Sequence, residues 1–148
     1  MGGRKAIIRQ LSHRTMNYFA YGSNLDREQM RACCPGASPA FTASLHHYKL
    51  IFSGWSRRWH GGTASIRAIR GEKVLGGVYE ISESDLRRLD KEEGYPDKYD
   101  RIEVIINREM GEPVKAFTYI LKRQPGEEKP SADYLAVIQR GYRDWGLI

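Results

Sequence analysis

The sequence has very few cysteines and no long hydrophobic run. Its only two cysteines, Cys33 and Cys34, are adjacent, so they cannot cross-link distant segments and do not match a metal-ligand spacing. No apolar run approaches the roughly 18 residues that a membrane-spanning helix needs. These absences argue against a disulfide-stapled protein and a membrane partner, and they favour a reducing, cytoplasmic location.

The usual catalytic nucleophile motifs are also missing. Ser23 lies in Tyr-Gly-Ser-Asn, which lacks the second glycine of a G-x-S-x-G elbow, and no cysteine–histidine signature surrounds the two cysteines. His46 and His47 are adjacent in an expected strand, so their side chains should point to opposite faces and cannot chelate one ion together. We therefore expect no covalent mechanism, no metal site and no cofactor.

The positive charge is concentrated at one end of the chain. The formal net charge is +6 over 148 residues, and the first fifteen residues carry four basic side chains and no acidic one. The remainder is close to charge balance, with no linker long enough to divide it. We expect residues 1–15 to be a basic, flexible extension and residues 16–148 to form one domain. A short transit peptide or an upstream start codon are alternative interpretations of the extension.

The alternation of apolar and turn-forming residues predicts an α+β domain. Three helices are expected, from Asp26 to Cys34, from Ser82 to Glu93 with Gly94 just past its end, and over residues 131–145. Strands outnumber helices and cluster in the middle, which favours a mostly antiparallel sheet that can close on itself. The expected strands cover residues 17–21, 40–53, 62–70, 73–80, 99–107 and 113–122.

One glutamate lies on the apolar face of the second expected helix. Glu93 follows Leu89 by four residues and Leu86 by seven, the spacing at which side chains share a helix face. A carboxylate held against a core or pocket loses solvation, which raises its pKa and makes it a usable proton shuttle near neutral pH. The alternative is a helix-end glutamate that reaches water or pairs with Arg67 or Arg101.

The segment YFAYGSNL, residues 18–25, predicts a strand, a tight loop and a helix start. Backbone N–H groups in such a loop can hold a carboxylate, which together with a lone glutamate suggests a small acidic substrate. The alternative is a plain turn in which Gly22 relieves strain and Asn24 or Asp26 caps the helix.

Four motifs, in this order, resemble those of the gamma-glutamylcyclotransferase family, and the resemblance extends over about residues 17–146. The motifs are YFAYGSNL at 18–25, WHGGTASI at 59–66, LDKEEGYPDKYDRIEV at 89–104 and AFTYIL at 116–121. The short stretch EGYPDKY resembles bacterial and plant members more than the animal glutathione-cycle enzymes. The resemblance implies a small, mostly antiparallel, closed β-barrel flanked by helices.

The resemblance also implies a reaction and its residues. The substrate's free α-amine attacks its own γ-carbonyl to give 5-oxoproline and release an amine, with Glu93 as general acid/base. A side-chain nucleophile is then unnecessary. Tyrosines matching Tyr99, Tyr119 and Tyr134 would line the pocket. The α-carboxylate would be cradled by the backbone amides of a loop made of Tyr21, Gly22, Ser23, Asn24 and Leu25.

The implied partner is therefore a small-molecule γ-glutamyl compound, and the identity of its amine and the oligomeric state stay open. The released half would face the 54–60 loop, whose alternative interpretation is an exposed basic hairpin with packed tryptophans. Two other functions are alternatives to this one. A member of the same fold could bind without turnover, and a nucleic-acid module could use the basic extension with this loop, although the charge balance elsewhere disfavours it. The loop residues are Trp55, Arg57, Arg58 and Trp59.

Overall fold

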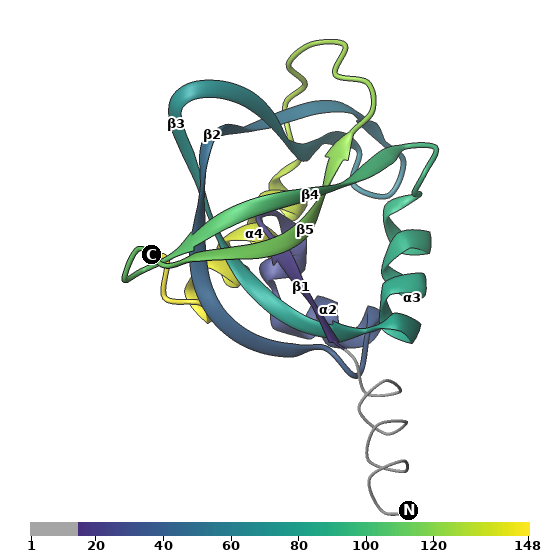
Figure 1. Ribbon diagram of the computed structural model, residues 1–148. Helices are drawn as coiled ribbons and strands as arrows, with labels where there is room; N and C mark the ends of the chain where they lie inside the picture. The colour runs from purple at the N-terminus through teal and green to yellow at the C-terminus, as the bar shows by residue number, and fades with distance from the viewer. Residues whose placement is uncertain (1–14) are drawn as a thin grey trace, which may run out of the picture.

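Five strands close into a β-barrel in the computed structural model, which describes residues 15–148 (Figure 1). The order around the barrel is β1-β3-β2-β4-β5, and every pairing is antiparallel except the short contact between β1 and β5. The expected α+β fold with a closed, mostly antiparallel barrel is confirmed. The strands are β1 (Thr15–Ala20), β2 (Ser38–Ser56), β3 (Gly61–Ser82), β4 (Tyr99–Arg108) and β5 (Pro113–Leu121).

The prediction of separate strands at 62–70 and 73–80 was wrong, because β3 runs continuously through both. Gly71 reads as a turn in the sequence, but here it bends the strand with a φ of 89°. The partner strand β2 bends with it through a register shift at His47, whose Nδ1 accepts a hydrogen bond of 3.1 Å from the Gly71 N–H. A matched pair of irregularities therefore curves both strands without interrupting either.

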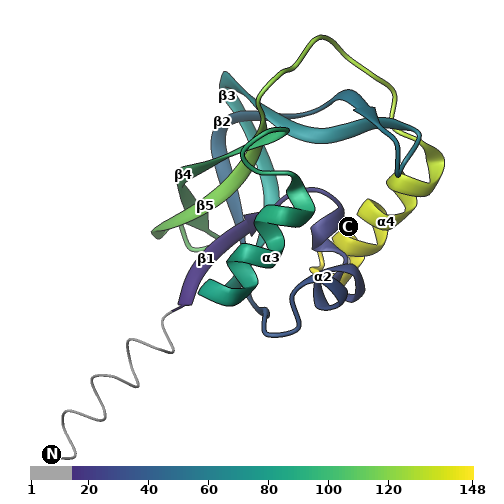
Figure 2. The ribbon, with the colours of Figure 1, turned by 90° about the vertical axis from the view of Figure 1, so that its right-hand side faces the viewer.

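Three helices flank the barrel, and Figure 2 shows α2 between α3 and α4. They are α2 (Arg27–Cys33), α3 (Glu83–Glu93) and α4 (Ala132–Asp144), with a short 3₁₀ turn, η1 (Ser23–Leu25), before α2. Side chains of Asp26 and Ser82 cap α2 and α3, and Gly94 ends α3 in the left-handed conformation. The helix starts and the end of α3 confirm the capping residues expected from the sequence.

Two apolar clusters hold the domain together. One fills the barrel, and the other lies between the barrel and the helices. Each fully buried large apolar side chain contributes roughly 1.5–3 kcal/mol. The first cluster includes Tyr21 and Tyr134, the second includes Tyr99 and Tyr119, and these four tyrosines line the same small cavity.

The expected extension, residues 1–15, lies outside the described residues except for Thr15, which begins β1. Within residues 15–148, no helix is both long enough and apolar enough to cross a membrane.

Candidate active site

The loop after β1 turns sharply at Gly22 and continues as η1. The amides of Ser23 and Asn24 open this 3₁₀ turn, so the turn itself supplies no acceptor for them. A Cβ at Gly22 would lie 3.1 Å from the Cβ of Ala64 and 3.8 Å from the hydroxyl oxygen of Tyr134. Glycine therefore keeps open the space between the loop and the barrel.

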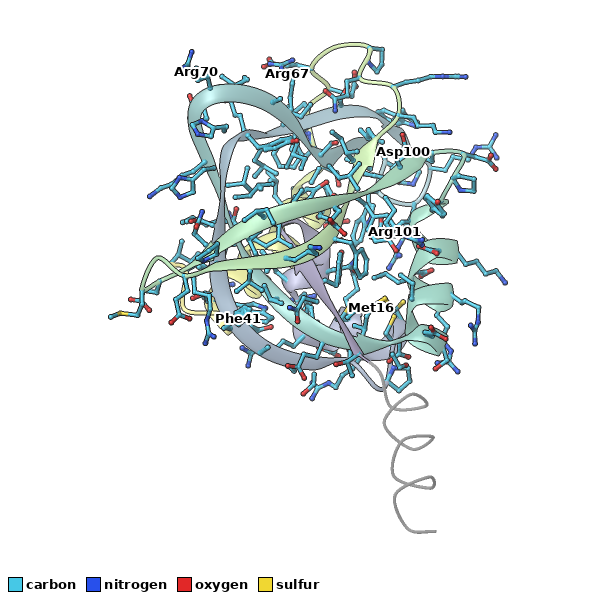
Figure 3. The ribbon with its side chains drawn as sticks, viewed as in Figure 1. Met16, Phe41, Arg67, Arg70, Asp100 and Arg101 are labelled. Carbon is cyan, nitrogen blue, oxygen red and sulfur yellow. The ribbon has the colours of Figure 1, made fainter. Side chains whose placement is uncertain are left out.

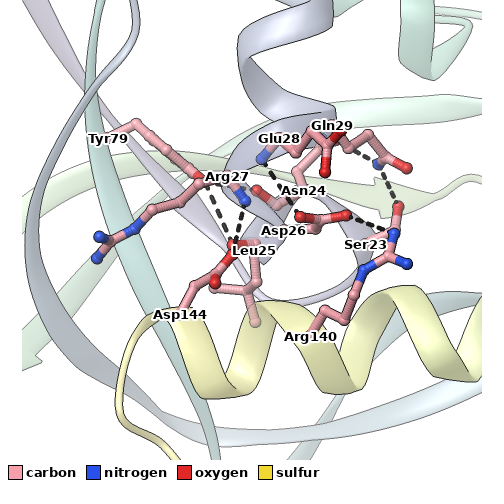
Figure 4. Close-up of polar contacts among 10 residues, drawn as sticks. All are labelled: Ser23, Asn24, Leu25, Asp26, Arg27, Glu28, Gln29, Tyr79, Arg140 and Asp144. Carbon is pink, nitrogen blue, oxygen red and sulfur yellow. Dashed lines mark hydrogen bonds and ion pairs between the residues drawn. The ribbon is translucent and has the colours of Figure 1, made fainter.

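Neighbouring elements hold this loop in one position. The Tyr79 hydroxyl donates to the Asn24 carbonyl oxygen at 2.7 Å, and the Trp145 Nε1–H donates to the Leu25 carbonyl oxygen at 2.8 Å. Figure 4 shows α4 beneath the loop, where Arg140 pairs with Asp26 at 3.0 Å. The loop is therefore fixed by β3 and α4 rather than by its own short turn.

A chain of amide side chains connects the loop to Glu93. The Gln29 Nε2–H group donates to the Ser23 Oγ at 2.8 Å and to the Asn24 Oδ1 at 3.0 Å (Figure 4). The Asn24 amide in turn donates to the Tyr18 hydroxyl at 2.9 Å and to Glu93 Oε1 at 2.8 Å. Because both N–H bonds of Asn24 are used, its side chain is committed to orienting Glu93 and Tyr18.

Glu93 is the last residue of α3, and its carboxylate faces into the site. Desolvation raises the pKa of this carboxyl to about 7. The hydrogen bond from Asn24 and the positive charges of Lys98 and Arg58 oppose the increase, while the negative charge of Glu92 adds to it. A group with a pKa near 7 can both take up and release a proton at neutral pH.

The alternative partners expected for Glu93 are engaged elsewhere or distant. Arg101 forms an ion pair with Asp90. Arg67 is exposed on β3, and Figure 3 shows it well apart from Arg101, whose partner Asp90 lies three residues before Glu93 on α3. Among the described residues, the side-chain hydrogen bond that Glu93 makes is the one from Asn24.

Glu93 borders a small inner cavity of about 40 Å³. Nearly all of the residues expected from the sequence meet there, and Glu93 is the one acid among the described residues that line it. Burial is the main cause that raises the pKa of the Tyr99, Tyr119 and Tyr134 hydroxyls, with the value for Tyr134 at about 12. The lining is Tyr18, Tyr21, Gly22, Ser23, Asn24, Ala64, Glu93, Tyr99, Tyr119 and Tyr134.

Leu25 differs from Ser23 and Asn24 in the expected cradle, because its amide already donates to the Gly22 carbonyl oxygen at 3.1 Å. Its side chain is completely buried in the cluster between the barrel and the helices, against Gly141 of α4. Two lining residues, Tyr18 and Ala64, were not proposed from the sequence. Both lie inside the motifs YFAYGSNL and WHGGTASI, so motif membership was the available signal, but only the fold shows which motif residues face the cavity.

The inner cavity opens into a larger outer cleft of about 720 Å³. The two share the residues around Glu93, and the outer cleft adds a charged rim. Only part of the 54–60 loop reaches the cleft. Arg58 and Trp59 line it, while Trp55 and Arg57 do not. The Trp55 side chain is 59% exposed. The charged rim residues are Asp26, Glu28, Arg58, Lys91, Glu92, Lys98 and Arg140.

No group of three or more histidine, cysteine, aspartate or glutamate side chains within residues 15–148 is arranged to hold a metal ion. His46 and His47 lie at the bulge of β2, with their ring centroids 6.4 Å apart. The chemistry that the described site offers is proton transfer by a carboxylate beside neutral hydroxyl groups.

The sequence profile of the family described as "Gamma-glutamyl cyclotransferase, AIG2-like" matches residues 18–136. This span contains the loop, Glu93 and the site tyrosines. The chain belongs to this family. The resemblance expected from the four motifs is therefore confirmed.

Relatives and solved structures agree with the family. Gamma-glutamylcyclotransferase of Mus musculus is 34% identical over 90% of this chain and 73% of its own length. The protein of the same name from Homo sapiens is 34% identical over 88% of this chain and 71% of its own. A solved gamma-glutamyl cyclotransferase structure superposes with a TM-score of 0.86 and 32% identity, covering 90% of this chain and 82% of that one.

These likenesses confirm the expected cyclotransferase function at the level of the family and do not favour the binding-only or nucleic-acid alternatives. The closer resemblance of EGYPDKY to bacterial and plant members stays a prediction. The roles assigned to individual residues also stay predictions.

Proposed function

We propose that this protein cyclises γ-glutamyl amides to 5-oxoproline and releases the amine, with Glu93 as the general acid/base. The observation that carries this proposal is the position of Glu93, a partly buried glutamate with a pKa of about 7 at the junction of the inner cavity and the outer cleft. The enzyme is of the gamma-glutamyl cyclotransferase type. We also propose that it acts in the cytoplasm, because the free thiols of Cys33 and Cys34 suit a reducing compartment.

The reaction moves two protons from the attacking nitrogen to the leaving nitrogen and needs no side-chain nucleophile. Glu93 removes a proton from the substrate's α-ammonium group, and the resulting amine attacks the γ-carbonyl carbon. A five-membered ring closes through the new carbon–nitrogen bond. The original amide bond then breaks as Glu93 returns the proton to the leaving nitrogen. The ring nitrogen loses its second surplus proton to the Glu93 carboxylate, and the released amine takes up that proton and leaves as an ammonium ion. One carboxyl group can perform both steps because its pKa lies near the working pH.

The remaining expected residues position the substrate. The amides of Ser23 and Asn24 are suited to the α-carboxylate, since the 3₁₀ turn leaves them without an acceptor of its own. The Tyr134 hydroxyl accepts a hydrogen bond of 2.9 Å from the Ala64 N–H, so its proton is available to a substrate oxygen. Holding the chain in a near-attack shape can contribute on the order of 7–11 kcal/mol.

The outer cleft is placed to receive the released half of the substrate. It is open to solvent and many times larger than the inner cavity. Arg58 lies over the Trp59 ring at 4.9 Å, which offers both a cation and an aromatic surface to the leaving amine. Differences between leaving groups should therefore be recognised at the rim rather than beside Glu93.

The test is 5-oxoproline formation from a panel of γ-glutamyl amino acids and amines by the full-length chain. We expect product with the wild type and almost none with Glu93→Gln, which keeps the acceptor oxygen that Asn24 contacts. Glu83→Gln is the matched control, because Glu83 is exposed at the other end of α3. A folded wild type that forms no product from the whole panel would contradict the proposal and support a binding-only role.

A further inference from the structure

Two tyrosine hydroxyls of the inner cavity have their protons committed to the main chain. The Tyr21 hydroxyl donates to the Tyr119 carbonyl oxygen at 2.6 Å, and the Tyr99 hydroxyl donates to the Ala64 carbonyl oxygen at 2.8 Å. A carbonyl oxygen can only accept, so the tyrosine is the donor in both bonds. Toward the rest of the cavity, each of these hydroxyl oxygens can therefore act only as an acceptor.

A third hydroxyl, that of Tyr119, donates out of the cavity to Asp90. The distance from the hydroxyl oxygen to Asp90 Oδ1 is 2.6 Å, and the other carboxylate oxygen of Asp90 pairs with Arg101. A carboxylate oxygen only accepts hydrogen bonds, so Tyr119 is the donor to Asp90. Asp90 lies three residues before Glu93 on α3, and Figure 3 shows Arg101 close to this helix. The Tyr119 proton is thus directed away from the substrate.

The three hydroxyls of Tyr21, Tyr99 and Tyr119, here called the acceptor cluster, stay neutral beside Glu93. Burial is the main cause that raises the pKa of each, and the hydrogen bond to Asp90 raises the pKa of Tyr119 further. The negative charge of Glu93 contributes to the increase at all three. The cavity therefore combines one carboxylate with three neutral acceptors.

We propose that the acceptor cluster binds the substrate's α-ammonium group beside Glu93, and that Asp90 is a positioning residue that fixes Tyr119 as an acceptor. This inference rests on the proposed function. An ammonium group has three N–H donors and no acceptor. One N–H can face Glu93 while the other two donate to hydroxyl oxygens of the cluster. If the Tyr119 proton pointed into the cavity, the Tyr119 O–H and an N–H of the ammonium group would be two donors facing each other.

The test compares two probes that differ only at the α-carbon: γ-glutamylalanine, and glutarylalanine, which has hydrogen in place of the ammonium group. Their dissociation constants are measured by calorimetry on full-length Glu93→Ala, in which the first probe should bind without turnover and no amide donor replaces the carboxylate. We expect γ-glutamylalanine to bind on the order of tenfold more tightly than glutarylalanine, through its additional hydrogen bonds.

Asp90→Asn then changes one hydrogen-bond direction at nearly constant shape. Arg101 can only donate, so it attracts the new amide oxygen, and the amide N–H₂ group faces Tyr119. The Tyr119 hydroxyl then accepts that bond, and its own proton turns into the cavity. In the Glu93→Ala background, we expect binding of γ-glutamylalanine to weaken about tenfold, while binding of glutarylalanine stays unchanged.

Tyr119→Phe supplies a second variant that removes the acceptor itself. Tyr119→Phe should weaken the binding of γ-glutamylalanine by a similar factor. Adding Asp90→Asn should then weaken this binding no further, because both substitutions act through one hydrogen bond. Equal weakening of both probes, additive losses, no preference for the ammonium-bearing probe, or binding of neither probe to folded protein would overturn the inference. Failure of the proposed function is seen separately, as absence of 5-oxoproline with the wild type.

Discussion

The inner cavity and the outer cleft share the residues around Glu93 but are built differently. The inner cavity is lined by neutral hydroxyls and amides held by hydrogen bonds of 2.6–2.9 Å. The outer cleft has a charged rim, where the Arg58–Glu92 pair is 3.9 Å apart and both side chains are more than half exposed. The fixed side chains of the inner cavity suit the glutamyl half of the substrate, which is the same in every substrate. The exposed side chains of the outer cleft suit the leaving amine, which differs between substrates. The two regions should therefore respond differently to substitution.

The largest effect is expected inside, at Glu93. Glu93→Gln should lower kcat by on the order of 10²–10⁴-fold, since general acid/base catalysis is lost while shape is kept. Steady-state assays of 5-oxoproline release would measure this. A variant that retains more than half of the wild-type rate would show that another group transfers the proton.

An intermediate effect is expected at Asn24, which orients Glu93 and lowers its pKa. Asn24→Ala should reduce kcat/KM about tenfold. It should also move the rising limb of the pH–rate profile above its wild-type midpoint of about 7, because the carboxylate loses a stabilising donor.

Asn17→Ala is the control for that profile, since Asn17 is a half-buried residue of β1 whose side-chain amide donates to the Lys115 carbonyl oxygen and not to Glu93. If the midpoint of the rising limb does not change in Asn24→Ala, or changes equally in both variants, then Asn24 does not influence the titration of Glu93.

A smaller effect that depends on the leaving group is expected at the rim. Arg58→Gln should raise KM for γ-glutamylalanine about threefold and leave KM for γ-glutamylethylamine unchanged, because only the first leaving group carries a carboxylate and exposed charge pairs are weak. Arg57→Gln is the matched control, since the neighbouring Arg57 does not line the cleft. An equal change with both substrates would place leaving-group recognition elsewhere.

A separate change is expected in stability, and it depends on pH. The Glu93 carboxyl has a folded-state pKa of about 7, above its ordinary value of 4.5, so folding favours the protonated form. The charged form therefore destabilises the fold as the pH rises through 7, and this penalty is absent below the ordinary pKa. Glu93→Gln should raise the free energy of unfolding by about 1–3 kcal/mol at about pH 8 and leave it unchanged at about pH 4.

Urea unfolding of the wild type, Glu93→Gln and the exposed control Glu83→Gln would measure this difference. A gain for Glu93→Gln that is the same at both pH values would mean that packing, and not the charge of Glu93, causes it.

Local signals in the sequence were enough for the helices and for the position of Glu93. Ser82 and Gly94 mark the two ends of α3, and the spacing from Leu89 places Glu93 on the inner face. Gly71 misled the strand prediction because a glycine bend inside a strand and a glycine turn between strands look alike until the partner strand is known.

Contacts between segments that are distant in the chain could not be predicted from the sequence. Asp90 reads as an ordinary helix residue, and its role depends on Tyr119, which follows 29 positions later on β5. Leu25 is part of the same motif as Asn24, yet the one packs against α4 and the other faces the cavity. The family motifs therefore located the site, and only the fold shows which of their side chains face it.

The most direct test of the central claim is an NMR titration of the Glu93 side-chain carboxyl carbon, combined with the pH dependence of kcat/KM. Both midpoints should fall together at about 7, and both should move upward in Asn24→Ala. Titration of Glu93 near its ordinary value of 4.5, or a rate midpoint that does not follow it, would contradict its role as the proton-transferring group.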